Sequence, residues 1–195
     1  GARLVALDTE TTGFDPAQGH ALVEVASVIL DEGRIGETWS TLTDPGRAIP
    51  AEASGVHGIT DAMVRGAPGP AVVATALEPR CAGRTLVFHN AAFDLPFLAA
   101  ALRRAGRPPL ANPVLDTLGL ARGLFDVGGN ALGALAARLG LPAERSHRAL
   151  GDALTTARLL QVLGERWERE KGVRTLAELA AASQDVLRLT NRRPR

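Results

Sequence analysis

Short apolar runs separated by polar turns open the chain. One apolar run covers residues 4–7 and ends at polar residues, and a longer one covers residues 22–30. Asp31-Glu32-Gly33 is a turn signal, after which residues 35–42 can return as a further strand. This pattern predicts three strands that pair as an antiparallel meander.

The period of the apolar positions changes later in the chain. Residues 44–70 are rich in Pro and Gly, and we expect them to be irregular. Beyond them, helical spacing predicts helices at residues 71–77, 97–105, 132–139, 153–167 and 175–189, and short apolar runs predict strands at residues 85–88 and 114–115. A strand meander followed by alternating helices and strands predicts an α/β fold, with a mixed five-stranded sheet flanked by helices.

A break at Gly172-Val173 separates the last predicted helix from the rest. We therefore expect one domain over residues 1–171 and a C-terminal helical tail over residues 172–195. Thr175 is a candidate cap for the tail helix, because Glu178 three residues later completes a capping box.

Composition narrows the class of protein. Hydrophobic residues make up 46% of the 195 residues and charged residues 22%, which is ordinary for a soluble globular protein. The net charge of +1 gives no global basic field, although bound metal ions can supply positive charge locally. The single Cys81 excludes an internal disulfide, and no apolar stretch is long enough for a membrane span. We expect a cytoplasmic protein, and a chain that opens on Gly1 can be a fragment of a longer one.

Two acidic residues follow the first predicted strand. Asp8 and Glu10 are two positions apart, so in a strand they project from the same face. Neighbouring carboxylates repel each other, and a cation between them removes that cost. Hard oxygen ligands without nearby Cys favour Mg²⁺ or Mn²⁺. The alternative is a solvated strand end.

Three more polar residues lie at predicted element ends. Asp94 follows the strand at residues 85–88, where the alternative is a helix N-cap. His147 precedes the helix at residues 153–167, where the alternative is a surface histidine. Asp152 lies near the start of that helix, where a first-turn acid is favoured by the helix dipole.

Taken together, these segments form an ordered set. Asp8–Gly13, His89–Asp94 and His147–Asp152 resemble, in this order, the three motifs of the DnaQ-like DEDDh 3′–5′ exonucleases. This family includes the proofreading epsilon-type exonuclease of bacterial DNA polymerase III. Val56–Thr60 and Asp116-Thr117 add to the resemblance. The sister subgroup uses Tyr in place of the histidine, and this chain contains no Tyr.

The resemblance covers roughly residues 4–165 and implies a ribonuclease H-like fold. It also implies metal-dependent removal of nucleotides from the 3′ end of DNA, with release of 5′-mononucleotides, in proofreading or repair. Two divalent cations, Mg²⁺ or Mn²⁺, would be held by Asp8, Glu10, Asp94 and Asp152. His147 would act as the general base.

The resemblance further implies that the turn after the metal pair holds the 3′-terminal nucleotide. The implied substrate contacts are Thr11, Thr12, Gly13, Phe14, His57, Ile59, Asn90 and Phe93. An apolar residue after the turn suits base stacking that reads no sequence. The alternatives are that Phe14 and Phe93 belong to the core, that His57 is structural, and that Asn90 braces the site.

Substrate and partners stay open at this stage. The expected substrate is a single-stranded or frayed 3′ end of DNA, with RNA trimming and a non-catalytic nucleic-acid-binding module as alternatives. A proofreading role would need a DNA polymerase subunit. Residues 184–189 resemble a sliding-clamp motif, but Val186, Leu187 and Leu189 can equally pack a terminal helix onto the domain.

Overall fold

A five-stranded sheet forms the centre of the computed structural model, which describes residues 2–125 and 129–191. The strands are β1 (Arg3–Thr11), β2 (Leu22–Asp31), β3 (Arg34–Leu42), β4 (Thr85–Phe88) and β5 (Val114–Asp116), in the order β3-β2-β1-β4-β5. β1, β2 and β3 are antiparallel neighbours, β4 pairs parallel to β1, and β5 pairs parallel to β4. The predicted mixed sheet is confirmed.

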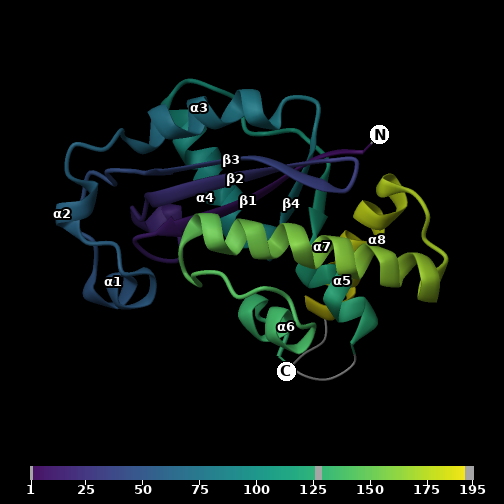
Figure 1. Ribbon diagram of the computed structural model, residues 1–195. Coiled ribbons are helices and arrows are strands. Elements are labelled where there is room, and N and C mark those ends of the chain that lie inside the picture. Colours follow the sequence, from purple (N-terminus) through teal and green to yellow (C-terminus); the bar gives the residue numbers. More distant parts are fainter. Residues whose placement is uncertain (1, 126–128, 192–195) are drawn as a thin grey trace.

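Helices cover both faces of this sheet (Figure 1). Leu4 and Ala6 of β1 pack in the cluster that includes α7 (Ala149–Lys171), whereas Val5 and Leu7 pack with α3 (Pro70–Cys81) and α4 (Ala91–Arg104). This alternation is the two-residue period of a strand, so the next even positions of β1 also face α7. β2 is buried on both faces as far as Leu30.

Several helices differ from the sequence prediction. The stretch of residues 44–70, expected to be irregular, contains α1 (Ala51–His57) and α2 (Asp61–Val64). These helices are one or two turns long, too short for a periodic apolar pattern to develop. α5 (Thr117–Leu124) was not predicted; it is eight residues long and contains Gly119 and Gly123, which weaken a helical pattern. Asp116 caps it, and its side chain accepts a hydrogen bond from the Leu118 N–H at 2.9 Å. A short 3₁₀ helix, η1, covers Pro16–Gln18.

The predicted C-terminal helix is present as α8 (Leu176–Asn191), and α6 covers Leu132–Arg138. α8 packs against α5 and the end of β5, where the Asp116 N–H donates to Ser183 Oγ at 3.1 Å. The capping box is confirmed, because the Glu178 N–H donates to Thr175 Oγ1 and the Thr175 N–H to Glu178 Oε2.

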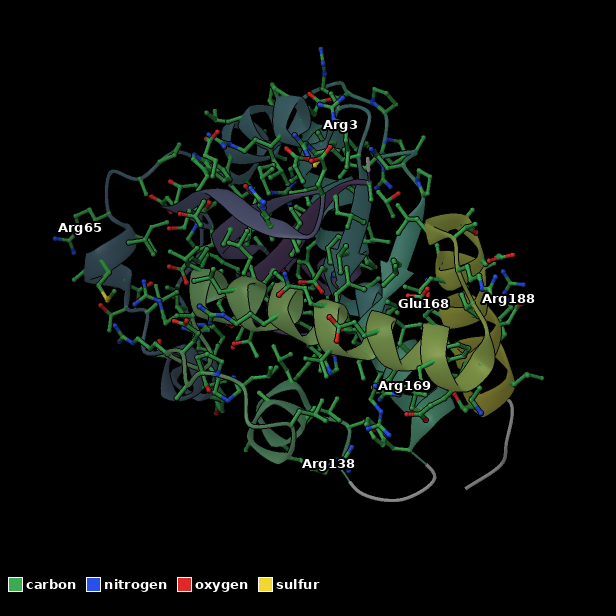
Figure 2. All side chains as sticks on the ribbon, turned by 45° about the vertical axis from the view of Figure 1, so that its right-hand side comes forward. Arg3, Arg65, Arg138, Glu168, Arg169 and Arg188 are labelled. Atoms are coloured by element: carbon green, nitrogen blue, oxygen red, sulfur yellow. The ribbon has the colours of Figure 1, made fainter. Side chains whose placement is uncertain are left out.

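Arg65 and Arg188 are exposed and lie at the periphery of the molecule (Figure 2). Among the helices of the described residues, none has both the length and the apolar character needed to cross a membrane.

Gly119 permits the close approach of α5 and α8. A Cβ atom at Gly119 would lie 2.1 Å from the Ser183 carbonyl oxygen, so Gly119→Ala must push the backbone of α8 away. We expect the free energy of unfolding to fall by about 1–3 kcal/mol in chemical denaturation. Gly133→Ala in α6 is the matched control, because a Cβ atom there meets nothing within 4 Å. Equal stability of Gly119→Ala and the control would contradict this packing.

Candidate metal centre

Three of the predicted acids meet at one end of the sheet. Asp8 and Glu10 lie at even positions of β1 and face α7, and Asp152 lies in the first turn of α7. One carboxylate oxygen from each of the three can be chosen so that all lie within 4.8 Å of one another. Such an all-oxygen set fits a hard divalent cation such as Mg²⁺ or Mn²⁺.

Asp94 reaches this end of the sheet from α4. That helix begins at Ala91, so Asp94 lies inside it and is not its N-cap. The side chain is buried, and its Oδ1 accepts from both the N–H (3.0 Å) and the hydroxyl (2.6 Å) of Thr9. Asp94 therefore lies beside the cluster of three carboxylates and is fixed to β1 between Asp8 and Glu10.

His147 lies in the turn before α7 and is exposed. Its backbone has a left-handed conformation with φ of 56°, and its N–H donates to Asp152 Oδ2 at 3.0 Å. Gly151 allows this turn to lie against the helix, because a Cβ atom there would come within 2.3 Å of the Arg145 carbonyl oxygen. His147 is therefore a surface histidine that is also tied to the acidic cluster.

Burial and mutual repulsion disfavour the charged forms of these acids. Burial, followed by the charges of Asp94 and Glu10, raises the pKa of Asp8. Burial and the charge of Asp152 raise the pKa of Glu10 to about 8, against a smaller lowering by Arg148. Burial also raises the pKa of Asp152. A bound cation would reverse this balance and hold the carboxylates ionised.

An apolar groove of about 360 Å³ adjoins the acidic cluster. It is lined by Glu10, Thr11, Thr12, Gly13, Phe14, His20, Pro50, Glu52, Ala53, Val56, His57 and Phe93. Phe14 is 90% exposed, so the alternative that it is a core residue is wrong. Phe93 lines the groove and also packs on the core, with its ring centroid 5.4 Å from that of Phe97.

Two predicted substrate contacts lie outside the apolar groove. Ile59 is fully buried with Val23 and Ile49, so its side chain packs in the core instead of facing the groove. Asn90 is the N-cap residue of α4, makes no side-chain cap hydrogen bond, and lines a separate hollow with His89. Its N–H donates to Asp116 Oδ1 at 2.9 Å, which is a bracing contact.

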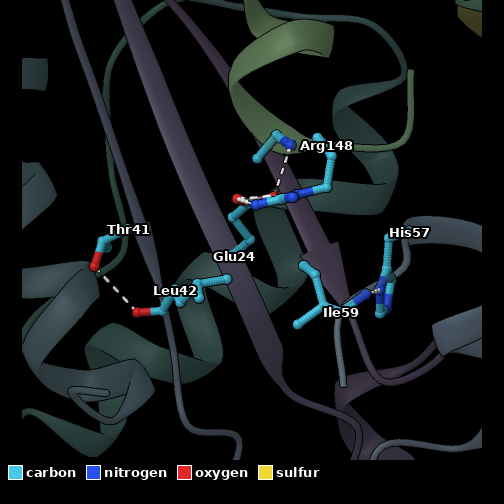
Figure 3. Close-up of polar contacts among 7 residues, drawn as sticks. Glu24, Thr41, Leu42, His57, Ile59 and Arg148 are labelled. Carbon is cyan, nitrogen blue, oxygen red and sulfur yellow. Dashed lines mark hydrogen bonds and ion pairs between the residues drawn. The ribbon is translucent and has the colours of Figure 1, made fainter. Parts of the chain in front are cut away.

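His57 lines the apolar groove, but both its ring nitrogens are used within the protein. Nδ1 accepts from the Ile59 N–H at 3.0 Å, so Nε2 carries the proton that is donated to the Thr11 carbonyl oxygen at 3.2 Å. Figure 3 shows His57 beside Ile59. Burial lowers the pKa of His57, which keeps the ring neutral. His57 therefore ties the end of α1 to the end of β1.

Sequence reasoning missed Glu24 and Arg148. Glu24 lies in β2 opposite Glu10 and is only 4% exposed, and Arg148 pairs with it at 2.7 Å (Figure 3). A single acid within the apolar run at residues 22–30 was the available signal, since a buried carboxylate requires a partner. The identity of that partner, 124 positions away, was not readable.

The sequence matches a known family over most of its length. A family model described as "Exonuclease" matches residues 5–160. The chain belongs to the exonuclease family. The resemblance inferred from the three motifs is therefore confirmed at the level of the family.

Relatives of this chain include proteins named after DNA polymerase III. A DNA polymerase III subunit epsilon-like protein of Rhodobacter capsulatus is 45% identical over 171 residues, which is 83% of this chain and 24% of that protein. A PolC-type DNA polymerase III of Clostridium perfringens is 36% identical over 95% of this chain and 13% of that protein. The chain thus spans a quarter or less of the length of these two relatives.

Solved exonuclease structures share the fold. Exonuclease X in complex with 5′ overhanging duplex DNA superposes with a TM-score of 0.72 and 29% identity, over 92% of this chain and 99% of that one. Escherichia coli Exonuclease I with a dT13 oligonucleotide gives a TM-score of 0.78 at 19% identity, over 93% of this chain and 46% of that one. The ribonuclease H-like fold expected from the sequence is confirmed.

The raised carboxyl pKa values predict a pH-dependent stability. Glu10 has a pKa of about 8 in the folded protein against an ordinary value of 4.5, so the metal-free fold binds its proton more tightly than the unfolded chain does. The contribution of Glu10 to the free energy of unfolding should therefore fall between about pH 4.5 and pH 8. In thermal unfolding, the melting temperature should fall less over this pH range in Glu10→Gln than in the unmodified protein.

Divalent cations should restore the stability that the protein loses as the pH rises. Because ionised carboxylates bind the cation, Mg²⁺ or Mn²⁺ should raise the melting temperature more at pH 8 than at pH 5. Glu10→Gln should reduce the gain at pH 8. Equal gains at both pH values, or in both proteins, would mean that the cation acts elsewhere.

Proposed function

We propose that this chain is a divalent-metal-dependent 3′–5′ exonuclease that removes nucleotides from the 3′ end of DNA, in proofreading or repair. The observation that carries the proposal is the cluster of the Asp8, Glu10 and Asp152 carboxylates, one of which, that of Glu10, also lines the apolar groove. Membership of the exonuclease family supplies the class of reaction. The direction of cleavage and the 5′-mononucleotide product are part of the proposal.

Asp8, Glu10 and Asp152 would hold the cations, with Asp94 beside them. Bound divalent cations would lower the pKa of a water molecule and neutralise charge on the scissile phosphate. Thr9 keeps Asp94 in one orientation through two hydrogen bonds. His147 is exposed next to Asp152, where its imidazole can accept a proton from an attacking water, as a general base does.

The apolar groove would receive the terminal nucleotide. Phe14 and Val56 line this groove and are exposed by 90% and 58%; Phe14 lies in the turn after β1 and Val56 in helix α1. Apolar and aromatic surfaces hold a base by stacking, which is independent of sequence. Thr11, Thr12 and Gly13 line the groove next to Glu10. The Thr11 hydroxyl donates to the Gly13 carbonyl oxygen and the Thr12 hydroxyl accepts from the Ala21 N–H, so this turn is held rigid and would form a wall beside the nucleotide.

DNA is the favoured substrate because the relatives named above are an epsilon-like protein and a PolC-type protein of DNA polymerase III by name, and Exonuclease X was solved with DNA. A polymerase subunit is the corresponding partner. Sliding-clamp binding by residues 184–189 is less well supported, because Val186 and Leu187 lie against the Gly123 and Gly119 positions of α5. Leu189 is the exposed apolar residue of that segment.

Oligonucleotides of one sequence, made as DNA and as RNA and labelled at the 5′ end, test the proposal. With Mg²⁺ or Mn²⁺, the DNA should shorten stepwise from its 3′ end, and Asp8→Ala should abolish the ladder. Cutting of RNA alone would establish the RNA-trimming alternative. Metal binding without cleavage of either the DNA or the RNA oligonucleotide would favour a non-catalytic binding module.

His147 has a separate test. His147→Ala should lower kcat on single-stranded DNA by about 100-fold or more, because a general base is removed while the carboxylates stay in place. The Mn²⁺-induced rise in melting temperature should be unchanged, which separates proton transfer from metal binding. An unchanged kcat would remove His147 from this role.

A further inference from the structure

Glu24 is a fifth acid close to the metal centre, but it does not belong to the cluster of three carboxylates. It lies in β2 directly opposite Glu10 in the antiparallel register, and it is 4% exposed. Like charges opposite each other on one sheet face are destabilising, so a second acid at this point requires compensation.

Arg148 supplies that compensation through a forked contact. Its Nε lies 2.9 Å from Glu24 Oε2 and its Nη2 lies 2.7 Å from Oε1. The backbone N–H of Ala149 donates to the same Oε2 at 2.9 Å (Figure 3). Both carboxylate oxygens of Glu24 are therefore occupied by donors from the chain, unlike those of a residue free to bind a cation.

These contacts fix the start of α7. Arg148 is the N-cap residue of this helix and makes no side-chain cap hydrogen bond, and Ala149 is its first residue. A helix start leaves N–H groups without partners, and here a carboxylate from another strand accepts one of them. A carboxylate at this end also interacts favourably with the helix dipole.

The same helix start carries two residues of the proposed active site. His147 immediately precedes Arg148, and its N–H is bonded to Asp152 in the first turn. Glu24, in turn, is paired with Glu10 across β1 and β2. The distance of His147 and Asp152 from Asp8 and Glu10 thus depends on a contact between β2 and the start of α7.

We propose that the Glu24–Arg148 pair is a positioning device that sets His147 and Asp152 against Asp8 and Glu10. This inference rests on the proposed function for its catalytic consequence. Glu24 and Arg148 are positioning residues and touch no reacting atom. Their loss should alter turnover and metal affinity more than substrate binding in the apolar groove, whose lining contains neither residue.

Arg148→Lys is the sharpest variant, because it keeps the positive charge and removes the planar fork. The matched control is Arg84→Lys. Arg84 forms a comparable fork with Asp31 at the other end of β2, where Nη2 lies 3.2 Å from Oδ2. Glu24→Gln is the second variant and keeps the shape of the side chain while removing its charge.

Steady-state kinetics on single-stranded DNA should separate positioning from general stability. At a temperature well below the melting point of every variant, we expect Arg148→Lys and Glu24→Gln to lower kcat at least tenfold. The KM for DNA should stay within about twofold, and Arg84→Lys should match the unmodified protein. A kcat within twofold of the unmodified value in Arg148→Lys, or an equal loss in Arg84→Lys, would overturn the proposal.

Calorimetric titration with Mn²⁺ gives a readout that does not need activity. Because Asp152 would shift relative to Asp8 and Glu10, the affinity for Mn²⁺ should fall several-fold in Arg148→Lys and stay unchanged in Arg84→Lys. If the unmodified protein binds Mn²⁺ but cuts no nucleic acid, the proposed function fails, and this titration still decides the positioning role. Unaltered Mn²⁺ affinity in Arg148→Lys overturns it.

Discussion

The repulsion between carboxylates crowded at one end of the sheet is the constraint on which this structure depends. Asp8, Glu10 and Asp152 come within 4.8 Å of one another, and Asp94 adds a further charge against Asp8. Such a cluster is unfavourable until a cation binds, so it exists only because the rest of the fold holds each acid in place. Burial is the largest cause of the raised pKa values of Asp8, Glu10 and Asp152, and repulsion from neighbouring acids adds to it.

Each acid is held by a different means. Asp8 and Glu10 are fixed by β1, which is paired with a strand on both sides. Asp94 is held to β1 by Thr9, and the start of α4 is in turn capped by Asp116, which accepts from the N–H groups of Asn90 and Ala91. The position of Asp152 depends on where α7 begins, because Asp152 lies in the first turn of this helix. The metal centre is therefore assembled from three elements that meet only through long-range contacts.

The sheet, and the meeting of Asp8, Glu10 and Asp152, could be predicted from the sequence for physical reasons. Apolar runs such as residues 22–30 are strong strand signals, and the Asp8–Glu10 spacing places both side chains on one face. α1 and α2 were missed because short helices leave little periodicity, and α5 because two of its eight residues are glycines. Ile59 was assigned to substrate from its motif, but a side chain that is fully buried belongs to the core. No local sequence pattern indicates whether such a side chain packs in the core or lines a groove.

The acids of this region differ in how many of their carboxylate oxygens accept hydrogen bonds from the chain. Glu24 and Asp116 have both carboxylate oxygens occupied by N–H donors of the chain, and both hold helix starts. Among the described residues, no such donor engages Asp8 or Glu10, whose oxygens stay free for a cation. Asp94 and Asp152 are intermediate, since each accepts hydrogen bonds through one oxygen, Oδ1 in Asp94 and Oδ2 in Asp152. A buried acid whose carboxylate oxygens all accept hydrogen bonds supports the site. A buried acid without such hydrogen bonds, close to other acids, is the better candidate for binding metal.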